Sequence, residues 1–180
     1  DQIDRISKII RSMLDTVRLQ KLEIQPTPFA DIVDRVLPLL RHAARRHGVT
    51  LATAIPGELP RMLADPGQMQ QVLINLVLNA LDATPPGGVV EIGARPEDSG
   101  GRGGVAVAVR DTGPGIPDEL KPRLFEPFFT TKPAGQGTGL GLAICRDIIR
   151  AHGGEIRVES QPGAGATFTV WIPAAAERGA

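Results

Sequence analysis

The sequence predicts an α/β fold: a two-layer sandwich of three helices on a mixed, mostly antiparallel sheet, preceded by one coiled-coil-like helix. Apolar residues recur at helical spacing in four separate stretches of the chain, which are residues 1–24, 29–47, 65–84 and 139–152. Shorter stretches of strand-like residues lie between and after those helices, at residues 49–55, 61–64, 89–95, 105–111, 155–160 and 166–173. This order of helices and strands favours helices packed on one sheet.

The first helix is expected to need a partner. Apolar residues at spacings of three and four follow the a/d rhythm of a coiled coil or bundle: Ile3, Ile6, Ile10, Met13 and Val17. Gln25-Pro26-Thr27-Pro28 then breaks the helix, because the residue before a proline disfavours helical backbone. The partner is most simply a second chain or an absent helix. Packing of the helix on its own domain is the alternative.

Proline and helix-capping residues mark the other predicted features of the helices. Pro38 lies inside the helix of residues 29–47 and is expected to kink it or remove one backbone bond. Asp65 is a candidate N-cap for the third helix, with Pro66 in its first turn and Gln68 at the capping-box position.

Three stretches are predicted to be irregular. Residues 97–104 are polar and glycine-rich and are expected to form a mobile hairpin loop. Residues 112–138 are expected to hold only a short helix near 117–125, and so long a segment is usually functional. The tail after Ala174 is expected to be disordered.

Composition narrows the possible functions. Lys and Arg number 20, as do Asp and Glu, so the chain has no basic footprint and we expect no nucleic-acid partner. The single Cys145 excludes an internal disulfide and fits a reducing, cytoplasmic compartment. No apolar run approaches the ~20 residues that span a bilayer. The chain begins with Asp1 and not Met, so we expect a piece of a longer protein, whose membrane attachment stays open.

Asn75 and Asn79 are the first candidate site residues. They lie one helical turn apart on one face of the third helix, among apolar neighbours. Buried amides need partners, so two of them favour a polar cleft, although an asparagine can also tie two backbone segments together. An amide oxygen is a ligand that suits Mg²⁺ when the ion already carries phosphate oxygens and waters.

Asp111 ends a predicted strand and enters Thr112-Gly113-Pro114-Gly115. A carboxylate there can accept a hydrogen bond from the exocyclic amine of adenine, and glycines would let the base come close. The same pattern occurs in many ordinary turns, so its position after the paired asparagines is what supports the nucleotide interpretation.

A phenylalanine-rich loop follows, with Phe125, Phe128 and Phe129 close together. It is expected to be a hydrophobic hinge or docking surface, and anchoring on the core is equally compatible. Lys132 in this loop is a candidate phosphate contact or an ordinary solvated lysine.

Glycines at 137, 139 and 141 lead directly into the last helix. Free N–H groups at that N-terminus would attract phosphate, and the glycines would permit a lid, with a flexible linker as the alternative. Thr167 could hydrogen-bond toward the base or be an ordinary strand residue. The chain has no Walker A loop, and Leu142 breaks the G-x-G-x-x-G spacing.

These motifs, in this order, resemble the N, G1, F and G2 boxes of bacterial sensor histidine kinases. Those kinases belong to the GHKL superfamily, which they share with gyrase, the heat-shock chaperone and mismatch-repair ATPases. The resemblance covers roughly residues 29–173, and residues 128–141 are most similar to the nitrogen-regulation type. It implies a Bergerat-type sandwich that binds ATP and Mg²⁺.

The resemblance also implies roles for individual residues. Asn79 would ligate Mg²⁺, Asn75 would line the phosphate site and Asp111 would read adenine, with residues 130–141 as the ATP lid. The full set of implied ATP-binding positions is Asn75, Asn79, Asp82, Asp111, Gly113, Gly115, Ile116, Phe128, Thr131, Lys132, Gly137, Thr138, Gly139, Leu140, Gly141, Leu142 and Thr167.

Residues 1–24 resemble the second helix of the dimerisation and phosphotransfer hairpin, which implies a homodimer in the parent protein. The first helix, which carries the phosphate-accepting histidine, is absent, and His42, His47 and His152 do not fit its setting. We therefore expect three parts: a partial phosphotransfer helix (1–24), an ATP-binding catalytic domain (25–175) and a disordered tail (176–180). No catalytic residue is assigned within this fragment.

The implied function is to present the γ-phosphate of Mg-ATP to a histidine outside this fragment, for relay to an aspartate on a response-regulator receiver domain. One alternative is an ATP-hydrolysing switch, but such enzymes carry Glu at the position of Asn75, and an amide is a poor general base. The other alternative is a module that only dimerises or docks.

Overall fold

The computed structural model describes residues 22–133 and 137–176. One five-stranded sheet has the order β2-β4-β5-β7-β6, in which β2 runs parallel to β4 and every other neighbouring pair is antiparallel. The strands are β2 (Thr50–Ala54), β4 (Val89–Ser99), β5 (Arg102–Asp111), β6 (Glu155–Ser160) and β7 (Ala166–Pro173). The predicted mixed, mostly antiparallel sheet is confirmed.

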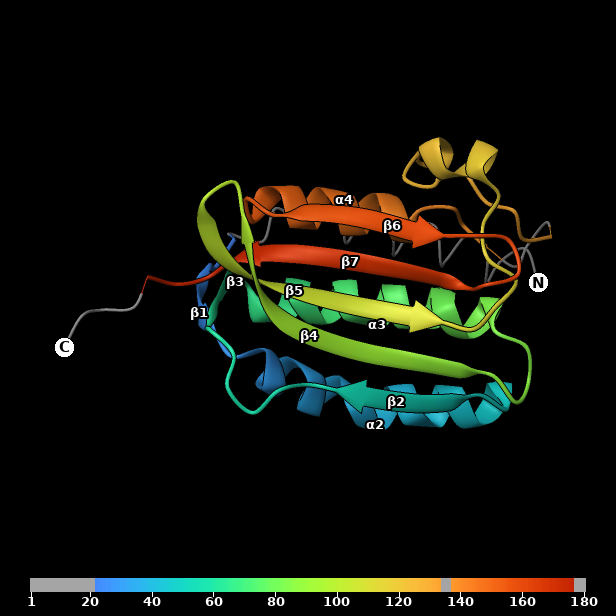
Figure 1. Cartoon of the computed structure of the whole chain (residues 1–180), viewed down its shortest axis with the longest axis horizontal. Helices are drawn as coiled ribbons and strands as arrows, with labels where there is room; N and C mark the ends of the chain where they lie inside the picture. Colours follow the sequence, from blue (N-terminus) through green and yellow to red (C-terminus); the bar gives the residue numbers. More distant parts are fainter. Residues whose placement is uncertain (1–21, 134–136, 177–180) are drawn as a thin grey trace.

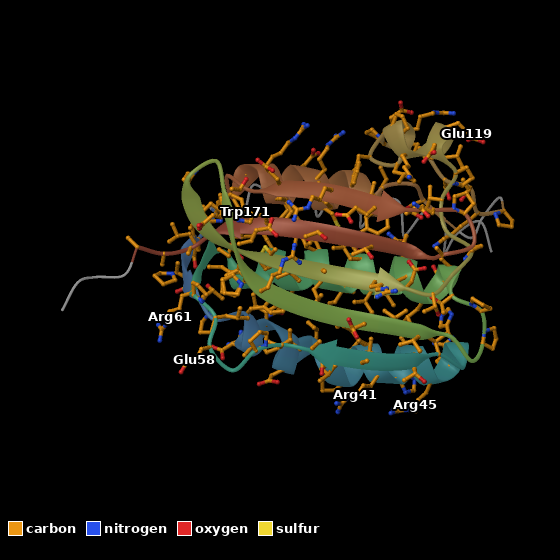
Figure 2. All side chains as sticks on the ribbon, viewed as in Figure 1. Arg41, Arg45, Glu58, Arg61, Glu119 and Trp171 are labelled. Carbon is orange, nitrogen blue, oxygen red and sulfur yellow. The ribbon has the colours of Figure 1, made fainter. Side chains whose placement is uncertain are left out.

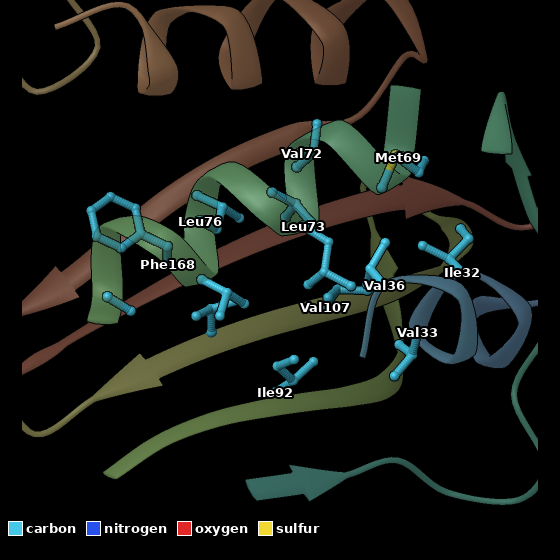
Figure 3. Packing of buried hydrophobic residues seen from close by; sticks show 14 of the residues in the cluster. Ile32, Val33, Val36, Met69, Val72, Leu73, Leu76, Ile92, Val107 and Phe168 are labelled. Atoms are coloured by element: carbon cyan, nitrogen blue, oxygen red, sulfur yellow. The ribbon is translucent and has the colours of Figure 1, made fainter. Parts of the chain in front are cut away.

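Three helices lie side by side on one face of this sheet, with α3 in the middle (Figure 1). They are α2 (Phe29–His47), α3 (Pro66–Ala83) and α4 (Gly141–Ala151). Apolar side chains from both layers meet between them, among them Val36, Leu76 and Val107 (Figure 3). The predicted two-layer sandwich of three helices on a sheet is therefore confirmed.

The start of α3 follows the predicted capping pattern. The Asp65 carboxylate accepts a hydrogen bond from the Gln68 backbone N–H at 3.0 Å, and Pro66 occupies the first turn. The Asp65 backbone N–H donates to His152 Nε2 at 2.9 Å, so the end of α4 is tied to the start of α3. This junction fixes the orientation of the helix that carries both candidate asparagines.

Helix α2 runs without interruption past Pro38, which lies on its exposed side. The helix ends where Gly48 adopts a left-handed conformation with φ 65°. A proline on the solvent side of a helix costs least, because water satisfies the carbonyl that loses its partner.

The chain around the sandwich differs from the sequence expectation in two places. Residues 22–24 are not helical, although the predicted helix of residues 1–24 includes them; residues 1–21 lie outside the described part of the chain. The extended segment becomes a strand, β1 (Gln25–Thr27), which pairs with β3 (Met62–Ala64) in a separate two-stranded sheet. Thr27 strengthens this pairing by donating its hydroxyl to the Ala64 carbonyl at 3.0 Å.

The expected mobile loop at residues 97–104 is wrong. Strands β4 and β5 continue through it in ladder register as far as Ser99 opposite Arg102, with a turn at Gly100 and Gly101, both at positive φ. A two-residue turn of this kind suits the twist of paired strands.

Side-chain contacts explain why these polar residues are ordered. The Glu97 carbonyl accepts a hydrogen bond from the Trp171 indole at 2.8 Å, and its carboxylate pairs with Arg157 at 2.6 Å. Arg157 is on β6, which β5 and β7 separate from β4 in the sheet. The end of the hairpin therefore curls over the sheet beside Trp171 (Figure 2). The local composition of these residues predicts a loop, because the partners that order them lie far away in the sequence.

The remaining boundaries follow the prediction closely. The short helix is a 3₁₀ helix, η1 (Asp118–Arg123), and the final hairpin has the predicted bounds. Past β7, the Ala175 N–H still donates to the Arg61 carbonyl at 2.7 Å, so the chain is ordered one residue beyond the expected start of the tail. Residues 177–180 lie outside the described part. Within that part, no helix is long and apolar enough to cross a membrane.

Substitution of Gly104 tests how tightly the curled hairpin packs. A Cβ at this position would overlap the Trp171 ring and come within 2.6 Å of the Ile172 carbonyl oxygen. Gly104→Ala is therefore expected to destabilise the protein by about 1–3 kcal/mol and to shift the emission of Trp171, the only tryptophan. Urea unfolding followed by tryptophan fluorescence measures both effects.

The matched control is the preceding residue of the same strand. At Gly103 an added Cβ makes only an ordinary contact, 3.5 Å from an Asp98 oxygen. Gly103→Ala is expected to leave stability within about 0.5 kcal/mol of the native value. Equal effects of the two substitutions would contradict the packing described here.

Candidate functional site

Both asparagines of α3 face the first half of α4. The Asn75 amide lies within hydrogen-bonding reach of the Cys145 thiol on α4. A Cβ placed on Gly141, the first residue of α4, would lie 3.7 Å from Asn79 Nδ2. Both asparagines are half-buried. The structure thus brings the two predicted residues to one surface, at the point where the segment of residues 128–140 enters α4.

The two asparagines differ in what already contacts them. Burial raises the pKa of the Cys145 thiol to about 12, with the Asn75 contact opposing that shift, so the thiol is neutral at physiological pH. Asn75 therefore lies against the Cys145 thiol of α4, and both interpretations of this asparagine stay open. Asn79 makes no side-chain hydrogen bond within the residues described, which leaves its amide available to a ligand.

Asp111 is a buried carboxylate, only 4% exposed, at the end of β5. Its Oδ1 accepts hydrogen bonds from the backbone N–H groups of Gly113 at 2.8 Å and Ala166 at 3.3 Å. Burial raises the pKa of Asp111, and the two hydrogen bonds partly offset that effect. Because both donors use Oδ1, the other oxygen remains for a ligand donor, which is the geometry that recognition of an amine requires.

The glycines around Asp111 allow backbone segments to touch one another. A Cβ on Gly113 would lie 2.8 Å from the Ala83 carbonyl oxygen at the end of α3. A Cβ on Gly165 would overlap the Asp111 carbonyl, and one on Gly115 would overlap the Gln161 carbonyl; both glycines also have positive φ. That these glycines let a nucleotide base come close to the backbone remains a prediction. The structure adds that these glycines hold β5, α3 and the β6–β7 turn together.

The phenylalanine-rich loop is anchored on the core, as one of its predicted interpretations has it, and its role as a hinge or docking surface remains a prediction. Phe125 packs edge-on against Phe168 of β7, with ring centroids 6.5 Å apart, and so anchors the loop on the core. The Arg123 guanidinium lies 4.4 Å from the centre of the Phe129 ring. Phe128 is 62% exposed and is the only non-glycine residue with positive φ among those described, at 67°.

The two ends of the glycine-rich segment are joined by a contact between residues 128 and 139. The Phe128 N–H donates to the Gly139 carbonyl at 2.9 Å, and Gly139, at φ 66°, has no room for a side chain against the Phe128 backbone. The two ends of the segment are therefore held together, which is the arrangement that a lid would require.

Lys132 and Asp82 were expected separately at the site, and the structure pairs them. Lys132 Nζ lies 2.5 Å from Asp82 Oδ2, and His47 Nε2 lies 3.7 Å from the other oxygen of that carboxylate. Asp82 is three residues beyond Asn79, on the next turn of α3. The pair therefore connects the segment of residues 128–140 to α3 one turn beyond the candidate magnesium ligand.

The structure gives the surroundings of the other predicted residues, whose part in binding remains a prediction. The Ile116 N–H donates to the Ser160 hydroxyl at 2.8 Å, and Leu142 packs on the core. Thr138 accepts a hydrogen bond of 3.4 Å from the Leu140 N–H. Thr131 is exposed. Thr167 pairs with Arg110 in the β5–β7 ladder, next to the residue that donates to Asp111.

Sequence reasoning missed Ser160. Its hydroxyl accepts from Ile116 and donates to the Gly165 carbonyl at 2.7 Å, so it joins the loop after Asp111 to the β6–β7 turn. A serine at the end of a strand carries no local signal of this role, because both partners are distant or lie across a turn.

The donor set fits a magnesium ion that arrives with phosphate better than one held by the protein alone. Within the described residues, no group of three or more His, Cys, Asp or Glu side chains could hold a metal ion. The neutral amide of Asn79 supplies one oxygen, and Mg²⁺ usually takes its other ligands from substrate phosphates and water.

The burial of Asp111 predicts how the stability of the fold depends on pH. Its raised pKa means that the ionised, buried carboxylate is unfavourable in the folded state. Folding is then favoured by this group below its unfolded pKa of about 3.9, and that contribution is lost as the pH rises through the higher folded value. Asp111→Asn, whose amide oxygen can still accept from Gly113 and Ala166, should be at least as stable as the native chain at pH 7.

Thermal unfolding without nucleotide at pH 7 and pH 4 measures the effect. The stability difference between variant and native chain should shrink at pH 4. The control is Asp118→Asn, which removes an equal charge from an exposed side chain. A large loss of stability at pH 7, confined to Asp111→Asn, would show instead that the ionised carboxylate stabilises the fold.

Comparison with known proteins gives a consistent family. The family model described as histidine kinase-, DNA gyrase B-, and HSP90-like ATPase matches residues 64–176. The sensor histidine kinase ZraS of Escherichia coli (strain K12) is 37% identical over 172 residues, which cover 96% of this chain and 36% of ZraS. The chain therefore spans little more than a third of the length of this curated relative.

Solved structures show the same similarity. The nucleotide-free catalytic domain of histidine kinase ThkA matches with a TM-score of 0.72 and 37% identity, over 86% of this chain and 97% of that one. Full-length ShkA in complex with AMPPNP matches with a TM-score of 0.82 and 34% identity, over 96% of this chain and 36% of ShkA. ThkA in complex with the response regulator TrrA matches with a TM-score of 0.77 and 34% identity, over 99% of this chain and 50% of that one.

The matched family covers the α3 asparagines, Asp111 and the glycine-rich segment, and the structural match extends over the whole sandwich. The chain belongs to the histidine kinase-, DNA gyrase B- and HSP90-like ATPase family and corresponds to the ATP-binding catalytic domain of sensor histidine kinases.

Proposed function

We propose that this domain binds Mg-ATP between α3, the loop after β5 and the segment of residues 128–140, and presents the γ-phosphate to a histidine elsewhere in the full-length protein. The observation that carries the proposal is the pairing of two available acceptors. These are the second carboxylate oxygen of Asp111 and the amide oxygen of Asn79. One suits the amine of adenine and the other suits a cation on the phosphates.

Each end of the nucleotide would then meet a different set of residues. Asp111 accepts from the exocyclic amine, and a guanine, with an oxygen at that position, would meet the carboxylate unfavourably. Lys132 lies near the phosphate end, one turn of α3 beyond Asn79. The N-terminus of α4, at Gly141, points free N–H groups toward the same end.

Magnesium, when bound with the nucleotide, would neutralise the charge that develops on the transferring phosphoryl group. Asn79 would orient it. The remaining contribution of the protein is positioning, which holds the γ-phosphate where an imidazole nitrogen can approach it in line.

Transfer is favoured over hydrolysis because the position of Asn75 on α3 offers no base for water. Asn75 has no proton affinity near neutral pH, and its amide contacts the Cys145 thiol. The hydrolysing alternative would need a carboxylate at this place. The docking-only alternative leaves the available oxygens of Asp111 and Asn79 without a purpose.

The histidines that the structure describes do not suit the acceptor role. His152 is 4% exposed, its Nε2 accepts from the Asp65 N–H, and its Nδ1 donates to the Ile148 carbonyl at 2.8 Å. Both ring nitrogens are therefore engaged. His42 is exposed on α2, and His47 ends that helix with its Nε2 3.7 Å from the Asp82 carboxylate; neither lies in the setting of the acceptor histidine that the family resemblance implies. The acceptor is therefore proposed to lie outside this chain.

We further propose relay of the phosphoryl group to a response-regulator aspartate and a homodimer through residues 1–24 in the full-length protein. The reported complex of ThkA with the response regulator TrrA supports the first of these. The cytoplasm is the expected compartment, because ATP is available there.

Asn79→Ala is expected to weaken Mg-ATP binding by about tenfold or more, which is about 1.4 kcal/mol, because it removes the amide oxygen from the cation. In EDTA the native and variant domains should bind ATP equally. Calorimetric titration with and without Mg²⁺ measures this. Gln70→Ala, which removes another amide from α3, serves as the control. Unchanged Mg-ATP affinity in Asn79→Ala would refute the role of ligand.

The isolated chain is expected not to phosphorylate itself, because the acceptor histidine is not within it. Incubation with γ-labelled ATP should leave the protein unlabelled, whereas the full-length protein under the same conditions should acquire an acid-labile, base-stable phosphate. Such a label on the isolated chain would contradict the expectation and point to one of its three histidines.

A further inference from the structure

The segment of residues 128–140 contains one charged residue, Lys132, and helix α3 contains one, Asp82. These two residues form the ion pair described above, with Nζ 2.5 Å from Oδ2. Neither α3 nor the lid offers another cation to a triphosphate. The nearest basic residue on α4, Arg146, already pairs with its neighbour Asp147 at 3.2 Å.

Lys132 is held at three points. Its backbone N–H donates to the Thr130 hydroxyl at 3.1 Å. Gly137 folds back against the aliphatic stem, where an added Cβ would lie 3.2 Å from Lys132 Cδ. The ammonium group then meets Asp82. The two side chains are 32% and 39% exposed, so the pair lies at the surface, where it contributes little to stability by itself and its ammonium group stays open to a ligand.

We propose that Asp82 is a positioning residue for Lys132. Its carboxylate holds the ammonium of the lid one turn of α3 beyond Asn79, so that a remaining N–H of Lys132 can meet the terminal phosphate of bound ATP. An ammonium group has three donors, so contact with Asp82 leaves two for the nucleotide. This inference rests on the proposed function, because it assigns a role at the same site.

The role predicts discrimination between ATP and ADP. A lysine that contacts the terminal phosphate contributes to Mg-ATP binding and little to Mg-ADP binding, and it does so only while it is held in place. Lys132→Gln should weaken Mg-ATP binding by about tenfold and Mg-ADP binding by less than about threefold. With Asp82→Asn already present, the further effect of Lys132→Gln on Mg-ATP should fall below about threefold.

The test is a double-mutant cycle of Lys132→Gln and Asp82→Asn, with dissociation constants for Mg-ATP and Mg-ADP from calorimetry. An equal loss from Lys132→Gln in both backgrounds would overturn the proposal, because Lys132 would then act independently. A larger loss in the Asp82→Asn background would overturn it too, because Asp82 would then compete with phosphate for the lysine. Asp147→Asn, which removes the partner of Arg146, should change neither constant.

A measurement without nucleotide separates this inference from the proposed function. Hydrogen exchange of a peptide spanning residues 128–142 should become at least about threefold faster in Asp82→Asn and stay unchanged in Asp147→Asn, because the lid loses its contact with α3. Unchanged exchange in Asp82→Asn would contradict the positioning role. Absence of nucleotide binding by the native chain, with faster exchange in the variant, would instead refute the proposed function alone.

Discussion

The site depends on close backbone contact around one buried carboxylate. Asp111 ends β5, and its Oδ1 accepts from the N–H groups of Gly113 and Ala166. Its own carbonyl lies against Gly165, where a side chain would not fit. Three segments thereby come into close contact: the loop after β5, the β6–β7 turn and the end of α3. The orientation of the free carboxylate oxygen follows from these backbone contacts, since Asp111 cannot turn without breaking them.

The same arrangement separates the two tasks of the site. Rigid elements, β5 and α3, hold Asp111 and Asn79, which would read the base and orient the cation. The segment of residues 128–140 is joined to them at its base by Phe128 and Gly139, and through Lys132 by a single ion pair. As the lid that we propose, a segment attached in this way would rearrange around a nucleotide while the base pocket keeps its shape, as many catalytic lids do.

The sequence predicted the sandwich well, because apolar periodicity and capping residues act locally. Asp65, Gly48 and the final hairpin all follow local rules. It failed at residues 97–104, where ordering comes from Trp171 and Arg157, both more than fifty residues away. The β1–β3 pairing was missed for the same reason.

The candidate site shows the same division between features that local sequence patterns predict and features that distant contacts determine. Motif order grouped Asn75, Asn79 and Asp111 at one site, which remains a prediction, and it did not distinguish Asn75, which lies against Cys145, from the available amide of Asn79. It explained Gly113 and Gly115 by the approach of a base, which remains a prediction, and it did not foresee that neighbouring backbone leaves no room for a side chain at either glycine. The role of Ser160 depends on two contacts that no pattern of residue types encodes.

The most direct test of this account compares two nucleotides that differ at one group of the base. Calorimetric titration with Mg-ATP and with Mg-ITP, in which an oxygen replaces the exocyclic amine, tests whether Asp111 reads that amine. The account predicts clear binding of Mg-ATP and at least about tenfold weaker binding of Mg-ITP. Equal affinity for the two, or no heat with either on well-folded protein, would contradict it.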